Sequence, residues 1–423
     1  MTRWTASAVA EALGVPVTGP GFSEISTDTR TLAPGALFVA LSGERFDGHD
    51  HLAAAARAGA SGAVVRRGTP PVPGLPLIEV DDPLAAYGLL ARARRRGIKG
   101  PVVAITGSNG KTSTKELVAA VLRTRFRVHA TALNLNNLVG VPQTILAAPP
   151  ETEALVIEAG ASAKGELARA RDIIEPTAVI ITNVAASHLD GFGSVEGILA
   201  EKLSLAAGAP LAIVGSTPPA LAEGAERLAG RVIVVAPPAA TADAEGRASF
   251  EVDGQQVHLG VHGVHQAGNA MLAWRLGREL HLRPAAMATA LGRVVLPGGR
   301  GELLQHGGLT VFNDSYNANP ASFFAAIATA RAMRPGRRLV FVAGTMKELG
   351  PDLLAAVGEF VPALEPYRGA LGDRLLVAPD APAMGPLLKA RLQGDELVVL
   401  KASRGAALER ILPYLGLTPA TSH

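Results

Sequence analysis

The sequence predicts an α/β protein with three domains, of which the central one is built on a doubly wound, mostly parallel sheet. At 423 residues the chain is longer than one ordinary hydrophobic core holds. From about residue 100, continuous apolar strands alternate with helical segments, as is typical of buried parallel strands. A glycine-rich loop joins the first of these strands directly to a helix. We expect the domains to comprise residues 1–83, 84–296 and 297–423.

Short apolar runs and their spacing predict the elements of each domain. In the first domain we expect helices at 5–14 and 51–59 and strands at 37–41, 63–65 and 77–80. In the central domain we expect strands at 102–106, 154–158, 178–182 and 211–214, a helix at about 113–124, and a hairpin at 248–261 that turns at Asp253-Gly254. The segment Pro297–Gly299 is the second boundary, and strands follow it at 339–343, 375–378 and 397–400.

Composition excludes several classes of protein. The chain has no cysteine, which excludes disulfides, thiolate metal sites and thiol catalysis. It has no apolar run of the ~18 residues that a membrane span needs, and its first residues are not followed by a signal-type apolar stretch. We therefore expect a cytoplasmic protein, and a monomer.

The formal net charge is only +3, but one segment, 92–99, is densely basic. It could be a nucleic-acid patch or the solvated last turn of a helix, where the helix dipole favours cations. No aromatic residues interleave with its charges, as a base-stacking surface would require. We prefer the helical turn and expect no nucleic-acid partner.

The loop Gly107–Thr112 has the features of a phosphate-binding loop, because a strand runs into it and a helix leaves it. Glycines let the backbone fold closely around phosphate oxygens, and the helix N-terminus favours an anion. Lys111 would contact the β- and γ-phosphates, and the Thr112 hydroxyl could hold Mg²⁺. The loop is shorter than the usual form, since Ile105 stands six residues before the lysine. The alternative is a glycine turn with a chance lysine.

Polar groups follow other strands of the same sheet. Glu158 ends one strand, and His188 and Asp190 follow another. Ligands in open parallel sheets bind beyond the carboxyl ends of the strands, and a carboxylate suits Mg²⁺ bound together with ATP. On pattern alone, in contrast, Lys202 is expected to be a surface lysine on a helix, where Glu201 could pair with it.

Together these motifs resemble the Mur ligases of bacterial cell-wall synthesis. The similar segments are the loop 106–112, Asn134–Pro142, Glu158–Ala161, His188–Gly193, Asn313–Ser322 in the third domain, and 27–41 with 43–50 in the first. The segment 313–322 is similar to that of the members that add D-alanyl-D-alanine to UDP-N-acetylmuramoyl-tripeptide. The resemblance covers nearly the whole chain. It implies three domains: a UDP-substrate domain, a central ATP domain, and a Rossmann-like domain that closes over ATP.

The resemblance also implies roles for residues. The catalytic group would comprise Lys111, Glu158, His188 and Lys202, with Lys202 carbamylated and two Mg²⁺ ions held by Thr112, Glu158, His188 and Lys202. ATP would contact Gly107, Ser108, Asn109, Gly110, Lys111, Thr112, Ser113, Asn269, Arg300 and Asp314, with His265 nearby. The UDP substrate would contact Thr29, Arg30, Arg45, Asp47, Gly48, His49, Asn136 and Asn137. The acceptor dipeptide would contact Tyr316, Asn317, Asn319 and Ser322.

The implied reaction activates the tripeptide carboxylate as an acyl-phosphate, which the dipeptide amine then attacks. The base that takes the amine proton stays open among His188, Asp190 and a phosphate oxygen. Three positions depart from the family pattern: Ser162 and Gln266 replace asparagines, and Thr345 replaces an acid.

Two other functions remain as alternatives. One is a related ligase that adds a single amino acid, such as the third peptide residue or a glutamate on folate. The other is a nucleotide-dependent switch or binding module that forms no bond. The segment 313–322 argues against the first alternative, and the sequence offers no arginine finger or effector surface for the second.

Overall fold

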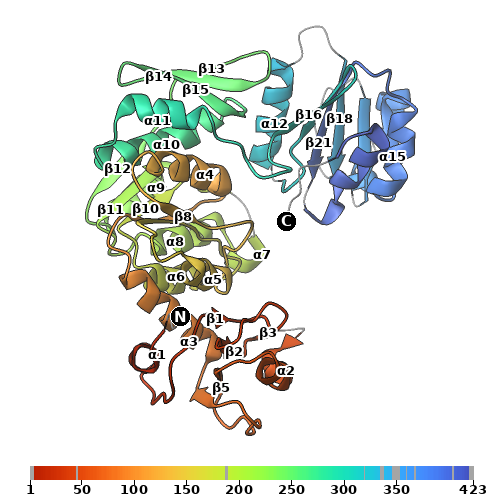
Figure 1. Cartoon of the computed structure of the whole chain (residues 1–423). Coiled ribbons are helices and arrows are strands. Elements are labelled where there is room, and N and C mark those ends of the chain that lie inside the picture. Colours follow the sequence, from red (N-terminus) through yellow and green to blue (C-terminus); the bar gives the residue numbers. More distant parts are fainter. Residues whose placement is uncertain are drawn as a thin grey trace.

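The computed structural model describes residues 4–43, 46–185, 189–318, 320–333, 338–344, 353–358, 360–365, 368–402 and 404–418. Three α/β units follow one another along the chain, and the C-terminal unit stands beside the upper end of the central one (Figure 1). The predicted α/β class is confirmed. In this part of the chain no helix has the length and apolar character needed to cross a bilayer.

The N-terminal unit is built on a four-stranded parallel sheet in the order β1-β2-β5-β6. Its strands are β1 (Ile25–Ser26), β2 (Leu37–Val39), β5 (Gly62–Arg66) and β6 (Leu77–Val80), with a small hairpin of β3 (Ser42–Gly43) and β4 (Phe46–Asp47). Its helices are α1 (Ala6–Leu13), η1 (Gly48–His51) and α2 (Leu52–Arg57). The α1 helix begins where the Thr5 hydroxyl accepts a hydrogen bond from Ala8 N, and it ends at the left-handed Gly14.

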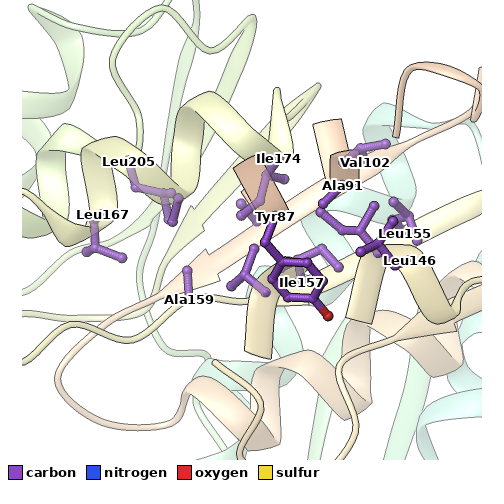
Figure 2. Close-up of a cluster of buried hydrophobic side chains, with 14 of the residues drawn as sticks. Tyr87, Ala91, Val102, Leu146, Leu155, Ile157, Ala159, Leu167, Ile174 and Leu205 are labelled. Atoms are coloured by element: carbon purple, nitrogen blue, oxygen red, sulfur yellow. The ribbon is translucent and has the colours of Figure 1, made fainter. Parts of the chain in front are cut away.

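Helix α3 (Pro83–Arg96) joins the N-terminal unit to the central one. The Asp82 carboxylate caps its first turn. Its buried face, with Tyr87 and Ala91, packs among side chains of the central sheet and its helices (Figure 2). One apolar cluster therefore runs without interruption from Trp4 in the first unit to Ala225 in the second.

The basic segment 92–99 is not simply a solvated turn. The guanidinium of Arg95 is half-buried and donates to the main-chain carbonyls of Ile174 and Glu175 at the end of helix α6 (Glu166–Ile174). Arg96 forms an ion pair with the Glu175 carboxylate at 2.6 Å. Arg95 thus satisfies carbonyls that the helix itself leaves unpaired, and Arg96 neutralises the carboxylate beside them. The prediction that 92–99 contains the last turn of a helix was correct, but the side chains of this turn are not fully solvated.

The central sheet has six parallel strands in the order β12-β11-β10-β7-β9-β8. They are β7 (Val102–Thr106), β8 (Val128–Ala130), β9 (Ala154–Glu158), β10 (Ala178–Ile181), β11 (Leu211–Gly215) and β12 (Val232–Val235). Strand β7 pairs with both β9 and β10, so the order of the strands reverses at β7. Ligands bind at such a switch point, beyond the carboxyl ends of the strands.

Helices cover both faces of this sheet, which explains the continuous apolar strands. Along β7, Val102 and Ala104 enter the cluster shared with the N-terminal unit, whereas Val103 and Ile105 enter a second cluster. The first face carries α3, α5 (Gly140–Ala147), α6 (Glu166–Ile174), α8 (Val195–Ser204) and α9 (Pro219–Glu226), and the second carries α4 (Lys111–Leu122), α10 (Gln266–Glu279) and α11 (Pro284–Leu291). The short α7 spans Leu189–Phe192.

The predicted hairpin is confirmed as β14 (Arg247–Val252) and β15 (Gln255–His262), with the short β13 (Thr241–Ala242) beside β14. Asp253 and Gly254 both have positive φ, at 50° and 69°, as a two-residue hairpin turn of this hand requires.

The C-terminal unit has a six-stranded sheet in the order β16-β17-β21-β18-β19-β20, in which only β16 is antiparallel. Its strands are β16 (Glu302–His306), β17 (Leu309–Asn313), β18 (Leu339–Gly344), β19 (Leu353–Val357), β20 (Leu375–Ala378) and β21 (Leu397–Ala402). Its helices are α12 (Pro320–Ala332), α13 (Phe360–Leu364), α14 (Arg368–Leu371), η3 (Gly372–Arg374), α15 (Ala381–Lys389), η4 (Arg404–Ala406) and η5 (Leu408–Leu415). In the described part of the chain, its apolar clusters contain no residue before 303.

Candidate active site

A cavity of about 700 Å³ lies between the central and C-terminal units, at the switch point of the central sheet. The phosphate loop and the ends of β9 and β10 form one wall, together with α8 and the start of α10. The opposite wall comes from the C-terminal unit. Most of the residues predicted for ATP, metal, catalysis and the acceptor line this cavity: Gly107 to Ser113, Glu158, Lys202, Asn269, Arg300, Asp314, Tyr316, Asn317 and Ser322.

The phosphate loop needs glycine at two positions. Gly107 has φ 151°, and a Cβ there would lie 1.8 Å from the Thr182 hydroxyl oxygen. Gly110 has φ 77°, and a Cβ there would lie 2.7 Å from the Asn269 side-chain oxygen. Helix α4 begins at Lys111, two residues earlier than predicted. The amide N–H groups of its first turn have no acceptor within the helix, so they can bind an anion.

The segment after β10 holds the loop in place. Ser108 N donates to the Asn183 carbonyl at 3.0 Å, and Asn109 N donates to Asn183 Oδ1 at 3.1 Å. The Ser108 hydroxyl donates to the Ala185 carbonyl at 2.8 Å. Sequence reasoning did not assign Asn183 a role. The sequence indicated Asn183 only by its position, because it directly follows the predicted strand 178–182 of the sheet that also holds the strand before the phosphate loop.

Lys111 folds back over its own loop. Its Nζ donates to the Gly107 carbonyl at 2.8 Å. Burial lowers the pKa of Lys111, an effect that Glu158 opposes and Arg300 reinforces. A phosphate group would replace this carbonyl as acceptor and restore full charge to the ammonium group.

Glu158 lies at the end of β9 with 2% of its surface exposed. Its two carboxylate oxygens accept hydrogen bonds from the Thr112 hydroxyl at 2.8 Å and from Asn136 Nδ2 at 2.7 Å. Its N–H donates to the Thr131 hydroxyl at 3.0 Å. Among the described residues no lysine or arginine forms an ion pair with Glu158. A buried carboxylate with only neutral partners suits a cation.

Asn136 and Asn137 were predicted to contact the UDP substrate, and the structure places both in this cavity. Asn136 holds Glu158. The Asn137 side-chain oxygen accepts hydrogen bonds from Val139 N and Gly140 N at the start of α5. Both side chains therefore support the central cavity from the segment before α5.

Lys202 is not the surface lysine that its sequence context predicted. It is 6% exposed on α8 and lines the cavity. Glu201 does not pair with it, because the Glu201 carboxylate accepts hydrogen bonds from Gly165 N and Leu167 N at 2.7 Å each. Burial, reinforced by the charge of Lys111, lowers the pKa of Lys202 to about 7. The prediction was wrong because both charges on α8 are buried: Glu201 binds the start of α6, and Lys202 lies in the cavity wall.

Three predicted site residues, Arg45, His188 and Asn319, lie outside the described residues, as does the departure at Thr345. The proposed metal role of His188 therefore stays a prediction, and the side chain of Asp190 is not described either. In the described ranges no three His, Cys, Asp or Glu side chains cluster as a preformed metal site. A metal here would depend on ligand oxygens as well as on Glu158.

At the start of α10, Asn269 is 9% exposed. Its Nδ2 donates to Gln266 Oε1 at 2.8 Å, and Gln266 Nε2 lies 3.4 Å from the Ser113 hydroxyl. Gln266, which departs from the family pattern, thus links the predicted adenine contact to the helix of the phosphate loop. His265, the residue before it, also lines the cavity.

The C-terminal wall of the cavity carries Arg300 and Asp314, which were predicted to contact ATP, and Tyr316, which was predicted to contact the acceptor. The guanidinium carbon of Arg300 lies 3.6 Å from the centre of the Tyr316 ring. Tyr316 therefore supports Arg300, a contact the sequence did not indicate. The Asp314 carboxylate forms a 2.7 Å ion pair with Lys401, which sequence reasoning also missed.

The residues predicted for the UDP substrate in the N-terminal unit lie apart from this cavity. Arg30 is highly exposed and pairs with Asp28 at 2.6 Å. His49 Nδ1 lies 2.6 Å from Asp47 Oδ1, and its Nε2 accepts a hydrogen bond from Arg66 N at 3.0 Å. Bonds from His49 hold the pKa of Asp47 well below its usual range. Asp47 and His49 thus fix their own turn, while the Arg30 guanidinium remains accessible.

Comparisons with known proteins agree with this architecture. Three family models match in order along the chain: the Mur ligase family catalytic domain over 22–95, the Mur ligase middle domain over 105–277, and the Mur ligase glutamate ligase domain over 299–413. A relative from Bacillus subtilis, UDP-N-acetylmuramoyl-tripeptide–D-alanyl-D-alanine ligase, is 32% identical over 99% of this chain and 100% of its own length. The Escherichia coli protein of the same name is 33% identical over 92% of this chain and 93% of its own.

Solved structures give the same result. MurF from Acinetobacter baumannii aligns with a TM-score of 0.87 at 26% identity, covering 97% of this chain and 98% of its own. MurF ligase from Thermotoga maritima in complex with ADP aligns with a TM-score of 0.80 at 27% identity, covering 92% of this chain and 96% of its own. With three domain models matched in order and homology along nearly its full length, the chain belongs to the Mur ligase family.

Proposed function

We propose that this protein joins D-alanyl-D-alanine to the terminal carboxylate of UDP-N-acetylmuramoyl-tripeptide, at the expense of ATP, in the synthesis of peptidoglycan precursors. The observation that carries the proposal is one cavity in which the phosphate loop and Glu158 face Asp314 and Arg300 of the C-terminal unit. The relatives with this activity in their names match nearly the whole chain. We assign the reaction to the cytoplasm, because it consumes ATP.

The first step activates the tripeptide. Its carboxylate oxygen attacks the γ-phosphorus, the bond to the β-phosphate oxygen breaks, and an acyl-phosphate and ADP form. Lys111 Nζ exchanges the Gly107 carbonyl for phosphate oxygens, and the first amide N–H groups of α4 stabilise the charge of the transferring group. Activation is needed because a free carboxylate resists attack by an amine.

The donor set around Glu158 fits Mg²⁺. The ion prefers oxygen ligands and usually takes one or two carboxylates together with phosphates and water. Glu158 and the Thr112 hydroxyl would hold it, with Asn136 orienting the carboxylate. When bound, Mg²⁺ neutralises charge on the ATP phosphates.

Lys202 is the residue we propose to be carbamylated. Its ammonium has no hydrogen-bond acceptor among the described residues, and its pKa of about 7 leaves much of the amine neutral. A neutral amine adds to CO₂, forming an N–C bond with loss of a proton, and yields an anionic group. That group, with His188, would hold a second Mg²⁺.

In the second step the amine of D-alanyl-D-alanine attacks the acyl carbon and phosphate leaves. Asn317 and Ser322 line the cavity where the acceptor would lie, with Asn319 as the further predicted contact. The base stays open among His188, Asp190 and a phosphate oxygen. Thr29, Arg30, Arg45, Asp47, Gly48 and His49 remain our proposal for the UDP end of the substrate.

Mass analysis of the product tests the function. The protein is incubated with ATP, Mg²⁺, UDP-N-acetylmuramoyl-tripeptide and D-alanyl-D-alanine, and parallel reactions contain diamino acids or glutamate instead. We expect the mass of the tripeptide precursor plus the dipeptide, less water, in the first reaction alone. A product with a single amino acid would favour a related ligase, and acceptor-independent ATP hydrolysis would favour a nucleotide switch.

A separate experiment tests the carbamate. Lys202→Ala should lose most activity and regain part of it with added short carboxylic acids, which can occupy the place of the carbamate. Equal activity with and without Lys202 would remove the modification from the mechanism.

A further inference from the structure

We propose that Lys401 is a positioning residue that sets the carboxylate of Asp314 and the turn at Asn317 against the nucleotide. The inference rests on the proposed function, which makes Asp314 a nucleotide contact. Lys401 lies near the carboxyl end of β21 and lines the cavity. It belongs to none of the motifs that the sequence singled out.

The Lys401 ammonium contacts one short segment at two points. Its Nζ donates to Asp314 Oδ2 at 2.7 Å and to the Asn317 main-chain carbonyl at 2.9 Å. A lysine has three N–H donors, and in the described part of the chain the third has no acceptor. Asp314 Oδ1 likewise has no donor there. One carboxylate oxygen is therefore fixed by Lys401, while the other remains available to ligand hydroxyls.

A lysine at this position is costly for the fold. Lys401 is 1% exposed, and every other residue of β21 is an apolar, buried side chain. An ammonium group taken out of water loses hydration energy that only a close ion pair with good hydrogen bonds offsets. An apolar residue would suit this strand better if packing were the only requirement. The burial of the Lys401 charge is therefore better explained by its role in orienting the Asp314 carboxylate.

Other bonds fix the path of the segment without Lys401. Asp314 N donates to the Leu400 carbonyl at 3.0 Å, and Tyr316 N donates to the Gly299 carbonyl at 2.9 Å. The Ser315 hydroxyl donates to Asn313 Oδ1 at 2.7 Å. Lys401 thus controls the direction of one carboxylate and one carbonyl more than the course of the main chain. Its removal should weaken nucleotide binding before it affects folding.

The test compares Lys401→Met, which keeps the length and removes the charge, with Lys401→Arg, which keeps the charge. Lys389→Met is the matched control, because that lysine is exposed on α15 of the same unit. The readouts are calorimetric titration with ADP and Mg²⁺, and the KM for ATP and for D-alanyl-D-alanine in the full protein. We expect K401M to weaken ADP binding and raise the KM for ATP by about tenfold to a hundredfold. K401R should recover part of this loss, and K389M should change neither value.

Coupling to Asp314 gives the decisive comparison. In a double-mutant cycle, K401M should weaken ADP binding little further once Asp314→Ala is present. Fully additive losses would overturn the proposal, as would unchanged ADP binding in a folded K401M. Loss of the fold in both K401M and K401R, measured by circular dichroism, would also overturn it by making Lys401 structural. ADP binding that depends on Lys401, in a protein that makes no pentapeptide product, would refute the proposed function alone.

Discussion

The two junctions between the three units are built differently. At the first junction, helix α3 carries buried side chains into the central unit, and one apolar cluster extends from Trp4 to Ala225. At the second, a cavity lined by both polar and apolar atoms lies between the units, and among the described residues each pair of elements across it makes few contacts. The His262 ring nitrogen Nδ1 lies 2.8 Å from the Gly301 carbonyl oxygen, and Gly246 lies so close to Met333 that a Cβ would be 2.8 Å from its Cγ.

The difference indicates which unit can move. Separating the first junction would expose a continuous core, whereas opening the second would expose the walls of the cavity and a few buried contacts, such as that of Met333 with Gly246. The proposed nucleotide contacts lie on both sides of the second junction. We therefore expect the C-terminal unit to close over the nucleotide while the other two units remain one body.

The largest expected effect is chemical and belongs to the second junction. Lys111→Ala should lower ADP release by about 10²- to 10³-fold, because the transferring phosphoryl group loses the cation of the phosphate loop. The midpoint of thermal unfolding should stay the same or rise, since a buried charge is removed. Coupled spectrophotometric assay of ADP and calorimetry measure the two effects. Normal turnover in this variant would refute the phosphate assignment.

The next effect concerns stability and belongs to the first junction. Leu90→Ala on α3 removes a side chain with no exposed surface, and should lower the free energy of unfolding by about 2–5 kcal/mol. Urea unfolding should show the N-terminal and central units losing structure in one transition. Leu412→Ala, in a core confined to the C-terminal unit, is the control and should affect that unit alone. Separate transitions for the first two units would contradict the shared core.

The smallest effect depends on pH and concerns Lys202 in the cavity wall. Its pKa falls from 10.5 to about 7 on folding, so between these values the unfolded chain binds more protons than the folded one. Stability should therefore rise with pH across this window. In CO₂-free buffer, Lys202→Met should be more stable than the native protein by about 1–3 kcal/mol at pH 7, with the gain shrinking toward pH 10.5. A gain that did not change with pH would show that the amine is not desolvated.

Local patterns predicted those parts of the site whose geometry depends on neighbours in sequence. The strand, glycine loop and helix at 102–122 and the turn at Asp253-Gly254 follow from backbone preferences that a few residues determine. Glu158 was found because a strand end marks one edge of a parallel sheet.

Other features depend on contacts between distant segments. Lys202 is buried because distant segments meet around the cavity that it lines, and Asn183 meets the phosphate loop only because β10 lies beside β7. Lys401 meets Asp314 because β21 pairs with β17. A sequence pattern does not contain these pairings. Strands β16 and β17 were missed for another reason: their turn, at Gly307-Gly308, joins a partly polar strand to an apolar one.

The hydrogen bonds between the phosphate loop and Asn183 have a consequence for the rate of turnover. A loop held by these hydrogen bonds is already ordered, so nucleotide binding spends less free energy on ordering it. The same stiffness means that this wall cannot yield to let spent ADP escape. We therefore expect ADP to leave when the facing C-terminal wall withdraws, so that opening of the second junction limits the rate of the cycle.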